Sequence, residues 1–228
     1  MTASILKDSP LFAFATALEF SRVFPEESSQ ASSVRALIPL RGKFEGSYAC
    51  ILGVGLLDFS VGLSKVLMDC TQTNVRVSSV INVGVCGAYP GRGLNVLDVV
   101  CVANEKVGDF GCEELDGSVT VWKNLYRGSS MEMAPDILRN CLLNIPQVTG
   151  ATVNCCTGTE ASALQRIKQL NCDVESMEGA ACFAVCESLG VPAFQIRAVS
   201  NIASTRDKSL WKIDEALEKL HQLFAFRG

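Results

Sequence analysis

Two acids three residues apart, Glu175 and Glu178, stand in the segment VESMEGAA at residues 174–181, where Glu178 is followed at once by glycine and two alanines. A carboxylate among such small, apolar neighbours is rarely buried unless another group pairs with it. Small residues also allow another surface to approach closely. Glu178 is therefore a candidate binding group, although the same segment could serve only to pack a helix against its neighbours.

Two other polar residues lie at or just after the ends of apolar runs that resemble strands. Glu19 comes after the run at 11–15 and falls in the first turn of the helix-like stretch ALEFSRVF at 17–24, where the helix dipole favours an acid. Asn201 ends the run at 193–200. Either residue could contact a ligand, or could stabilise only its own helix end or turn.

Two glycine-rich stretches also follow predicted strands, namely GVG at 53–55 and GVCGAYPGRG at 84–93. Glycine lets backbone amides come close to a ligand, so the second stretch could cradle one. The spacing of Gly84, Gly87 and Gly91 does not match the G-x-G-x-x-G pattern of dinucleotide sites. Both stretches could instead be plain connections, and for GVG a tight turn is the simpler interpretation.

Strand-like and helix-like stretches alternate along the whole chain. The apolar patterns predict strands at 11–15, 48–53, 77–83, 95–107, 151–155 and 193–200, and helices at 17–24, 58–70, 161–170, 176–189 and 211–224. In the helix at 176–189, Ser176 is expected at the N-cap and Gly190 just past the end. The alternation predicts one α/β domain over residues 1–228, with a mostly parallel or mixed sheet covered by helices and with residues 1–10 as a loosely ordered tail.

Ligands of such sheets bind beyond the carboxyl ends of the strands. The polar or glycine-rich features described above, and one further loop, fall at such ends, in segments 16–19, 53–55, 84–88, 156–159 and 200–201. We expect these segments to form one pocket.

Composition restricts the partners and the compartment. A net charge of −4 and a pI near 5.1 argue against a nucleic-acid partner. No apolar run approaches the roughly 20 residues that span a bilayer, and the N-terminus lacks the basic start of a signal peptide. Eleven cysteines and one histidine, without a C-x-x-C pair, predict reduced thiols in a cytoplasmic protein that uses neither a metal nor another cofactor.

Three motifs together resemble the purine nucleoside phosphorylase and nucleosidase superfamily: NVGVCGA (82–88), VESMEGAA (174–181) and IRAVSNIAS (196–204). Within it, EKVGDFG (105–111), CTGTEA (156–161) and RDKSLW (206–211) are similar to the futalosine hydrolase branch, whose members act in menaquinone biosynthesis. The resemblance implies a three-layer α/β/α sandwich with a mixed, partly closed sheet. It also implies cleavage of an N-glycosidic bond, and a homodimer in which a neighbouring subunit completes the pocket.

The resemblance also assigns roles. Glu178 would bind the ribose 2′- and 3′-hydroxyls with Met177 packed under the sugar, and Glu19 would be the general base that activates water. The stretch around Glu19, TALEF, differs from the acid-rich stretch of related nucleosidases. The positions expected to line the departing base are Val85, Cys86, Gly87 and Cys156.

Asn201 is the main departure, because many adenine-releasing relatives carry aspartate at its position. An amide offers both a donor and an acceptor, which match O6 and the N7–H of a departing 6-oxopurine. Hypoxanthine is therefore expected as the leaving base, as in futalosine. An alternative is a 5′-methylthioadenosine/S-adenosylhomocysteine nucleosidase that releases adenine.

Two further alternatives concern the acceptor and turnover. Phosphate-using relatives carry arginine and serine in a segment like R-V-G-S-C-G, whereas residues 82–87 read NVGVCG and the Gly-Asp-Pro phosphate loop is absent. Water is therefore the expected acceptor, phosphorolysis is less favoured, and a non-catalytic nucleoside-binding relative remains open. The carboxylate at the 5′ end of futalosine needs a cation, for which Arg92, Arg197 and Arg206 are candidates; Arg197 could instead pair with a buried acid such as Glu175.

Overall fold

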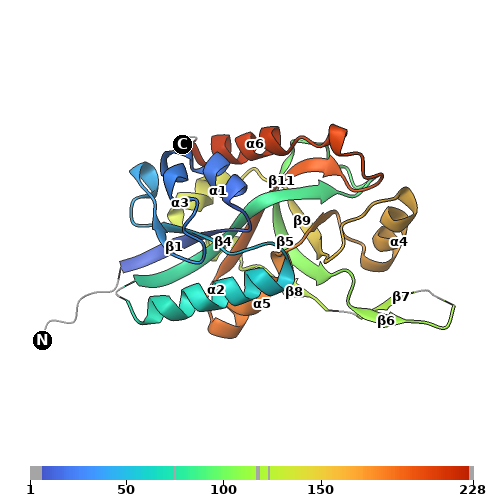
Figure 1. Ribbon diagram of the computed structural model, residues 1–228, viewed down its shortest axis with the longest axis horizontal. Helices are drawn as coiled ribbons and strands as arrows, with labels where there is room; N and C mark the ends of the chain where they lie inside the picture. The colour runs from blue at the N-terminus through green and yellow to red at the C-terminus, as the bar shows by residue number, and fades with distance from the viewer. Residues whose placement is uncertain (1–6, 74, 117–118, 123, 226–228) are drawn as a thin grey trace, which may run out of the picture.

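The computed structural model describes residues 7–73, 75–116, 119–122 and 124–225 (Figure 1). The strands are β1 (Lys7–Phe14), β2 (Ile38–Pro39), β3 (Tyr48–Ile51), β4 (Val75–Ala88), β5 (Val99–Val107), β6 (Gly111–Glu113), β7 (Val119–Val121), β8 (Tyr126–Arg127), β9 (Gln147–Thr152), β10 (Val174–Ser176) and β11 (Ala193–Ile202). The α-helices are α1 (Ala17–Val23), α2 (Gly55–Thr71), α3 (Asp136–Leu142), α4 (Glu160–Leu170), α5 (Gly179–Leu189) and α6 (Ile213–Ala225).

The main sheet has the order β10-β9-β5-β11-β4-β1-β3-β2, with β8 on β5. Strands β1, β3, β4 and β11 are mutually parallel, while β5 runs antiparallel to β11. Short β10 pairs in parallel with β9 and also antiparallel with the end of β4, where Glu175 lies opposite Gly87. The second pairing closes β4, β11, β5, β9 and β10 into a ring. The prediction of a mixed, partly closed sheet is confirmed.

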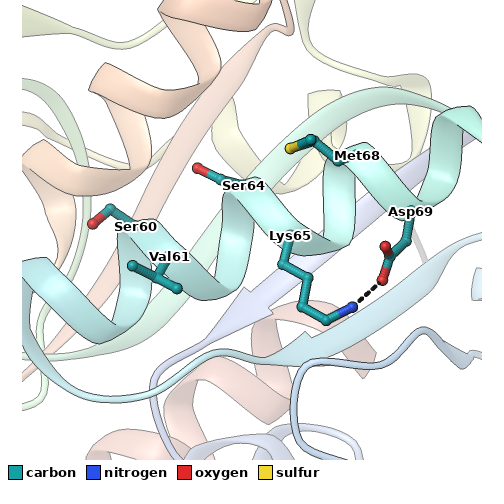
Figure 2. A pocket seen from close by; sticks show the side chains of 6 residues that line it. All are labelled: Ser60, Val61, Ser64, Lys65, Met68 and Asp69. Carbon is teal, nitrogen blue, oxygen red and sulfur yellow. Dashed lines mark hydrogen bonds and ion pairs between the residues drawn. The ribbon is translucent and has the colours of Figure 1, made fainter.

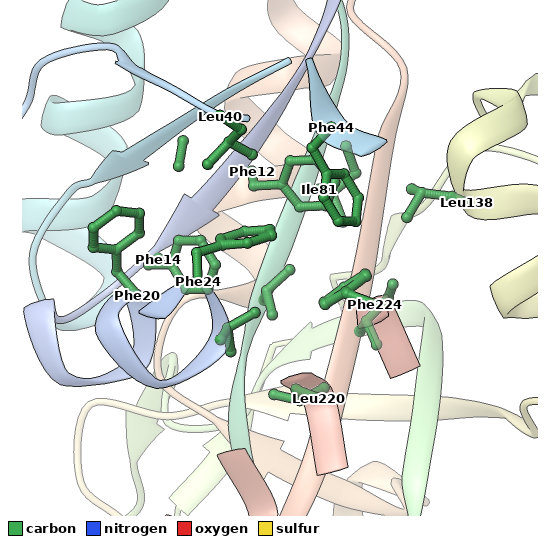
Figure 3. Packing of buried hydrophobic residues seen from close by; sticks show 14 of the residues in the cluster. Phe12, Phe14, Phe20, Phe24, Leu40, Phe44, Ile81, Leu138, Leu220 and Phe224 are labelled. Carbon is green, nitrogen blue, oxygen red and sulfur yellow. The ribbon is translucent and has the colours of Figure 1, made fainter. Parts of the chain in front are cut away.

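Helices cover both faces of the extended part of the sheet, with α1, α3 and α6 on one side and α2 and α5 on the other (Figure 1). One face of helix α2 packs against the core through buried residues that recur every three or four positions, such as Phe59, Leu63, Val66 and Cys70. The opposite core is aromatic (Figure 3), and the Phe12 ring lies edge-on to Phe24 with centroids 5.3 Å apart. Two cores on one sheet give the three layers that the sequence predicts.

The structure corrects several predicted boundaries. Residues 84–88, predicted as a turn, continue β4, and residues 7–10, predicted as part of a loose tail, lie in β1; residues 1–6 fall outside the described part of the chain. Ser176 is not an N-cap but the last residue of β10, and Glu178 is the residue before α5. Gly190 ends α5 in the left-handed conformation (φ 67°), as predicted.

All eleven cysteines are free thiols, and seven are buried among apolar side chains. Their interpretation as small core residues fits these seven. Among the residues that the structure describes, none of the helices combines the length and apolar character needed to cross a bilayer.

Candidate active site

Glu19 is fixed at the carboxyl end of β1 by a reciprocal cap. Thr16 Oγ1 accepts the Glu19 N–H (3.1 Å), while Glu19 Oε2 accepts both the Thr16 N–H (3.1 Å) and its hydroxyl (2.9 Å). This capping box satisfies two amides at the start of α1 and holds the glutamate side chain back toward the sheet. Glu19 is therefore buried, with 7% of its surface exposed, although it lies on a surface helix.

The other Glu19 oxygen turns toward β4. Glu19 Oε1 accepts the N–H of Val85 at 3.2 Å. A Cβ atom at Gly84 would overlap both this oxygen and Nη1 of Arg197. Gly84 is therefore needed for close approach within a strand, because any side chain would separate the carboxylate from the guanidinium.

Glu178 reaches the same place from the junction between β10 and α5. Its Oε1 accepts the N–H of Gly55, the first residue of α2, at 3.1 Å, and its Oε2 accepts from Arg197 Nη2 at 3.3 Å. Arg197 lies on β11 with 1% of its surface exposed, and its Nη1 also donates to the Val85 carbonyl at 3.4 Å. Arg197 does pair with a buried acid, as suggested, but that acid is Glu178 and not Glu175.

Two buried carboxylates thus surround one guanidinium, so the cluster of Glu19, Glu178 and Arg197 has one negative charge more than it has positive charges. Burial raises the pKa of Glu19, the charge of Glu178 raises it further, and Arg197 opposes both effects. Nε of Arg197 has no hydrogen-bond partner within the described chain. Oxygen-rich ligands with hydroxyl donors would complement such a cluster.

Asn201 lies four residues after Arg197 on the same strand, half-buried on β11 opposite Gly87 of β4. Ser200 Oγ donates to Asn201 Oδ1 at 2.8 Å, and Asn201 Nδ2 donates to the Ile202 carbonyl at 3.3 Å. A Cβ atom at Gly87 would lie 3.2 Å from Asn201 Nδ2. The amide is thus oriented by its neighbours at the end of β4, where the sequence predicts the base.

Two cysteines were expected near the base. The Cys86 side chain is buried, and burial raises the pKa of its thiol to about 12. Burial, followed by the charge of Glu175, also raises the pKa of Cys156, which lies in the loop after β9. Neither sulfur is set up as a thiolate nucleophile. Met177 is half-buried between β10 and α5, next to Glu178.

The three arginines proposed for a carboxylate differ in their surroundings. Arg197 belongs to the acidic cluster, and Arg92 pairs with Asp173 at 2.8 Å. Arg206 is exposed and lies over the Trp211 ring, 5.9 Å from its centroid. Within the described residues, Arg206 has no carboxylate at ion-pair distance, whereas Arg92 and Arg197 each have one.

Sequence reasoning undervalued two residues of the site. Gly55, in the GVG stretch taken as a tight turn, supplies an amide to Glu178, and its positive φ of 86° is what allows that orientation. Arg197 was read as a possible structural partner of another acid. The available signal was the position of GVG directly after a buried strand, where a backbone donor is expected. Across the described chain, no group of three or more His, Cys, Asp or Glu side chains is arranged to hold a metal ion.

A separate groove of about 440 Å³ lies on the outer side of α2, lined by Ser60, Val61, Ser64, Lys65, Met68 and Asp69 (Figure 2). Its lining consists of an ion pair between Lys65 and Asp69, two serine hydroxyls and apolar side chains. The acidic cluster, not this groove, holds Glu19, a buried carboxyl with a raised pKa of the kind that marks a reaction site.

Known proteins provide an independent comparison. The chain is 30% identical over 211 residues to futalosine hydrolase from Streptomyces coelicolor, covering 88% of this chain and 85% of the relative. It is 29% identical over 194 residues to futalosine hydrolase from Thermus thermophilus, covering 74% and 79%. Its fold aligns with futalosine hydrolase of Helicobacter pylori (TM-score 0.74, 14% identity, 96% and 97% covered). It also aligns with the 5′-methylthioadenosine/S-adenosylhomocysteine nucleosidase of that organism (TM-score 0.72, 14% identity, 95% of each chain covered).

The two structural matches show a shared fold, while a sequence profile makes a wider assignment. Residues 40–225, which include Glu178, Arg197 and Asn201, match the profile described as the Phosphorylase superfamily. This chain belongs to the phosphorylase superfamily.

Proposed function

We propose that this protein is a hydrolase that cleaves the N-glycosidic bond of futalosine, releasing hypoxanthine and dehypoxanthine futalosine in menaquinone biosynthesis. The observation that carries the proposal is the buried cluster in which Glu178 pairs with Arg197 and Glu19 lies close enough to interact electrostatically with both. The sequence relatives named futalosine hydrolase support the choice of substrate.

Glu178 is assigned to the ribose. Its two oxygens already accept from Gly55 and Arg197, and each has a lone pair left for a sugar hydroxyl. Cleavage passes through a sugar with oxocarbenium character, so a carboxylate held beside the ring stabilises the positive charge that develops. Met177, adjacent in sequence, is assigned to the apolar contact under the sugar.

Glu19 is assigned as the general base. Its carboxylate takes one proton from water, the water oxygen bonds to C1′, and the electron pair of the breaking C1′–N9 bond passes into the purine, which takes up a proton at N7 from solvent. General bases of this kind contribute a factor of about 10² to 10⁴. The raised pKa brings Glu19 closer to the range where a carboxylate accepts a proton readily.

Asn201 is assigned to the leaving base. With Oδ1 oriented by Ser200, the amide can accept from the N7–H of the departing ring and donate to O6. A carboxylate at this position could do both only if protonated. The backbone around Val85, Cys86, Gly87 and Cys156 is assigned to the faces and edges of the same ring.

Water is preferred to phosphate as the acceptor because the residues that would hold an anion are otherwise engaged. Asn82 is buried on β4 and donates to Gln195 Oε1 at 3.0 Å, while the Val85 side chain offers no donor. Arg197 is neutralised by Glu178. A phosphate dianion beside two carboxylates would be repelled.

We assign Arg206 to the carboxylate of the 5′ benzoate group. The guanidinium lies over the Trp211 ring, so an aromatic acid would meet both a cation and an aromatic face. The backbone N–H of Arg206 donates to the carbonyl of Gly158 at 3.3 Å, which ties this segment to the loop that holds Cys156.

We further propose a cytoplasmic homodimer. Helix α2 begins at Gly55, which contacts Glu178, and exposes Leu57, Val61 and Met68, the last two of which are drawn in Figure 2. These positions recur at intervals of four and seven residues, so a second copy could pack along this stripe and lie next to the ribose site. Light scattering, with Val61→Glu as the disrupting variant, tests the dimer.

A substrate panel tests the proposed reaction. The purified protein is incubated with futalosine, 5′-methylthioadenosine, S-adenosylhomocysteine and inosine, with and without phosphate, and the products are identified by mass spectrometry; a Glu19→Gln preparation controls for contaminating enzymes. We expect free hypoxanthine from futalosine and, in ¹⁸O-labelled water, label in the sugar product. Adenine release without hypoxanthine would replace futalosine by the adenine nucleosides, and ribose 1-phosphate would indicate phosphorolysis. No turnover at all would favour a binding protein.

A further inference from the structure

A second buried ion pair lies outside the acidic cluster and has no part in the mechanism above. Glu175 of β10 and Arg166 of α4 are joined by a contact of 3.0 Å between Oε2 and Nη1, with 6% and 15% of their side-chain surfaces exposed. The carboxylate also accepts from the Tyr89 hydroxyl at 3.0 Å. Burying this pair is costly unless further hydrogen bonds complete it, so its remaining contacts indicate what it holds in place.

Those contacts converge on one short loop. Glu175 Oε1 accepts the N–H of Thr157 at 2.8 Å, and Oε2 accepts the Thr157 hydroxyl at 2.5 Å. Arg166 donates to the same hydroxyl at 2.8 Å and, through Nη2, to the carbonyl of Cys155 at 2.6 Å. The residues on either side of Cys156 are therefore clamped by opposite members of one ion pair.

The clamp stands beside Asn201. Gly87 of β4 lies opposite Glu175 on one neighbouring strand and opposite Asn201 on the other. A Cβ atom at Gly87 would lie 3.2 Å from Asn201 Nδ2 and 3.5 Å from Glu175 Cγ, so both side chains point to the same side of the strand. Glu175 of the clamp and the Asn201 amide, which is assigned to the base, therefore lie on the same side of β4.

We propose that Glu175 and Arg166 are positioning residues for the base end of the site: they fix the backbone of residues 155–157 relative to Asn201 and so set the affinity for the departing purine. This inference rests on the proposed nucleosidase function. Because the ion pair acts through Thr157 and Cys155 and not on the sugar, it sets base binding without changing the Glu19 and Glu178 chemistry.

The local chemistry fits a positioning role. Burial and the Glu175 charge raise the pKa of the Tyr89 hydroxyl, which keeps it a donor to the carboxylate. Burial raises the pKa of the Cys156 thiol, so this loop offers backbone and neutral groups to a purine. A neutral, rigid loop can lie along the edge or face of an uncharged heterocycle.

The test separates base binding from sugar chemistry. The double variant Glu175→Gln/Arg166→Gln removes both charges together, which avoids leaving one of them buried alone. Affinity for free hypoxanthine is measured by calorimetry, and turnover of 4-nitrophenyl β-D-ribofuranoside, whose leaving group needs no purine contact, is measured in parallel. The matched control is Arg92→Ala, which breaks the ion pair with Asp173 just before β10. Thermal melting checks that each variant folds.

We expect hypoxanthine affinity to fall by about tenfold or more in the double variant, while nitrophenyl riboside turnover stays within about threefold of wild type. Arg92→Ala should leave both unchanged. Unchanged hypoxanthine affinity, or an equal loss in both measurements, would overturn the inference. If the double variant does not fold, Tyr89→Phe and Thr157→Val decide in the same two measurements. A wild type that binds hypoxanthine but cleaves no nucleoside would refute the proposed function alone.

Discussion

Two buried clusters of polar side chains lie on neighbouring parts of the sheet, and they differ in how they treat a carboxylate. In the acidic cluster, Glu19 and Glu178 share the single cation Arg197 and accept backbone amides from Val85 and Gly55. The excess negative charge can be complemented by hydrogen-bond donors of a ligand.

The second cluster, beneath α5, holds its acid with neutral groups. Glu105 is fully buried and accepts from Gln195 Nε2 at 2.6 Å and from the Thr152 hydroxyl at 3.0 Å. Thr152 Oγ1 in turn accepts the N–H of Ala180 at 2.8 Å, and a Cβ atom at Gly179 would overlap the Glu105 carboxyl. This explains the glycine of the MEGAA motif: it leaves room for a buried carboxyl that anchors the start of α5.

The difference shows what marks a reaction site among buried acids. Chiefly because it is buried, Glu105 has its pKa raised to about 7, so protonation can remove the cost of burying a charged carboxylate. The pKa of Glu19 is raised by burial and by the charge of Glu178, and the Arg197 guanidinium opposes both effects. An acid held among neutral donors is a structural element, whereas two acids competing for one cation are poised for chemistry.

The largest expected effect comes from Glu19→Gln. The amide keeps the shape of the side chain but cannot take a proton from water, so kcat on the preferred nucleoside should fall by about 10²- to 10⁴-fold. Steady-state kinetics measure the loss. Glu105→Gln is the matched control, with kcat within about threefold of wild type. Equal losses in the two variants would erase the distinction between the clusters.

A smaller loss is expected for Glu178→Gln, which weakens the charged contact to the ribose diol. We expect kcat/KM to fall by about 10- to 100-fold, the range for charge-assisted hydrogen bonds. A 2′-deoxy substrate sharpens this test. Removing the 2′-hydroxyl should cost activity in the wild type and nearly nothing in Glu178→Gln. If the two losses multiply instead, the carboxylate does not contact that hydroxyl.

At the base end, Asn201→Asp should change selectivity more than overall rate. The new carboxylate repels O6 of hypoxanthine and can match a 6-amino group, so the ratio of kcat/KM for 6-oxo over 6-amino nucleosides should fall about tenfold. Competition assays with both substrates give the ratio directly, and Asn140→Asp on exposed α3 controls for added charge. An unchanged ratio would remove Asn201 from base recognition.

The two neighbouring carboxylates predict an effect of pH on rate that the neutral cluster does not. Glu19 works as a base only when ionised, and its raised pKa means that kcat/KM falls, as pH is lowered, at a pH above the ordinary carboxyl range. Since the Glu178 charge is one cause of the shift, Glu178→Gln should move this acidic limb to lower pH. The pH–rate profiles of wild type and variant measure the displacement. A limb at the same pH in both would show that the two carboxylates are not coupled.

The three polar residues could be singled out from the sequence, but their partners could not. Glu19 and Asn201 stand out because each follows or ends an apolar run, and Glu178 stands out because small, apolar residues follow it; all three features are local. The contacts of Glu178 with Gly55 and Arg197 depend on strands brought together from distant parts of the chain. No local propensity encodes those pairings.

The segment around Ser176 shows the same limit. Serine is a favoured N-cap, so a helix start there was the reasonable local prediction. In the fold, however, residues 174–176 pair on one side with β9 and on the other with the end of β4, and this ring closure takes Ser176 into a strand. The helix starts three residues later because tertiary pairing overrides capping preference, and this shift brings Glu178 to the junction.

The last expected effect concerns stability, not activity, and tests the neutral cluster directly. With its folded-state pKa near 7, Glu105 keeps its proton as pH rises from about 4.5 to 7, whereas the unfolded chain loses it, so the free energy of unfolding falls across this window and levels off above it. Glu105→Gln has no proton to lose, so its stability relative to wild type should improve across the same window by up to about 3 kcal/mol. Urea unfolding from pH 5 to 8 measures the difference, with exposed Glu132→Gln as the control. A constant difference between wild type and Glu105→Gln would mean that Arg197 keeps Glu105 ionised, and the two clusters would then be one charged network.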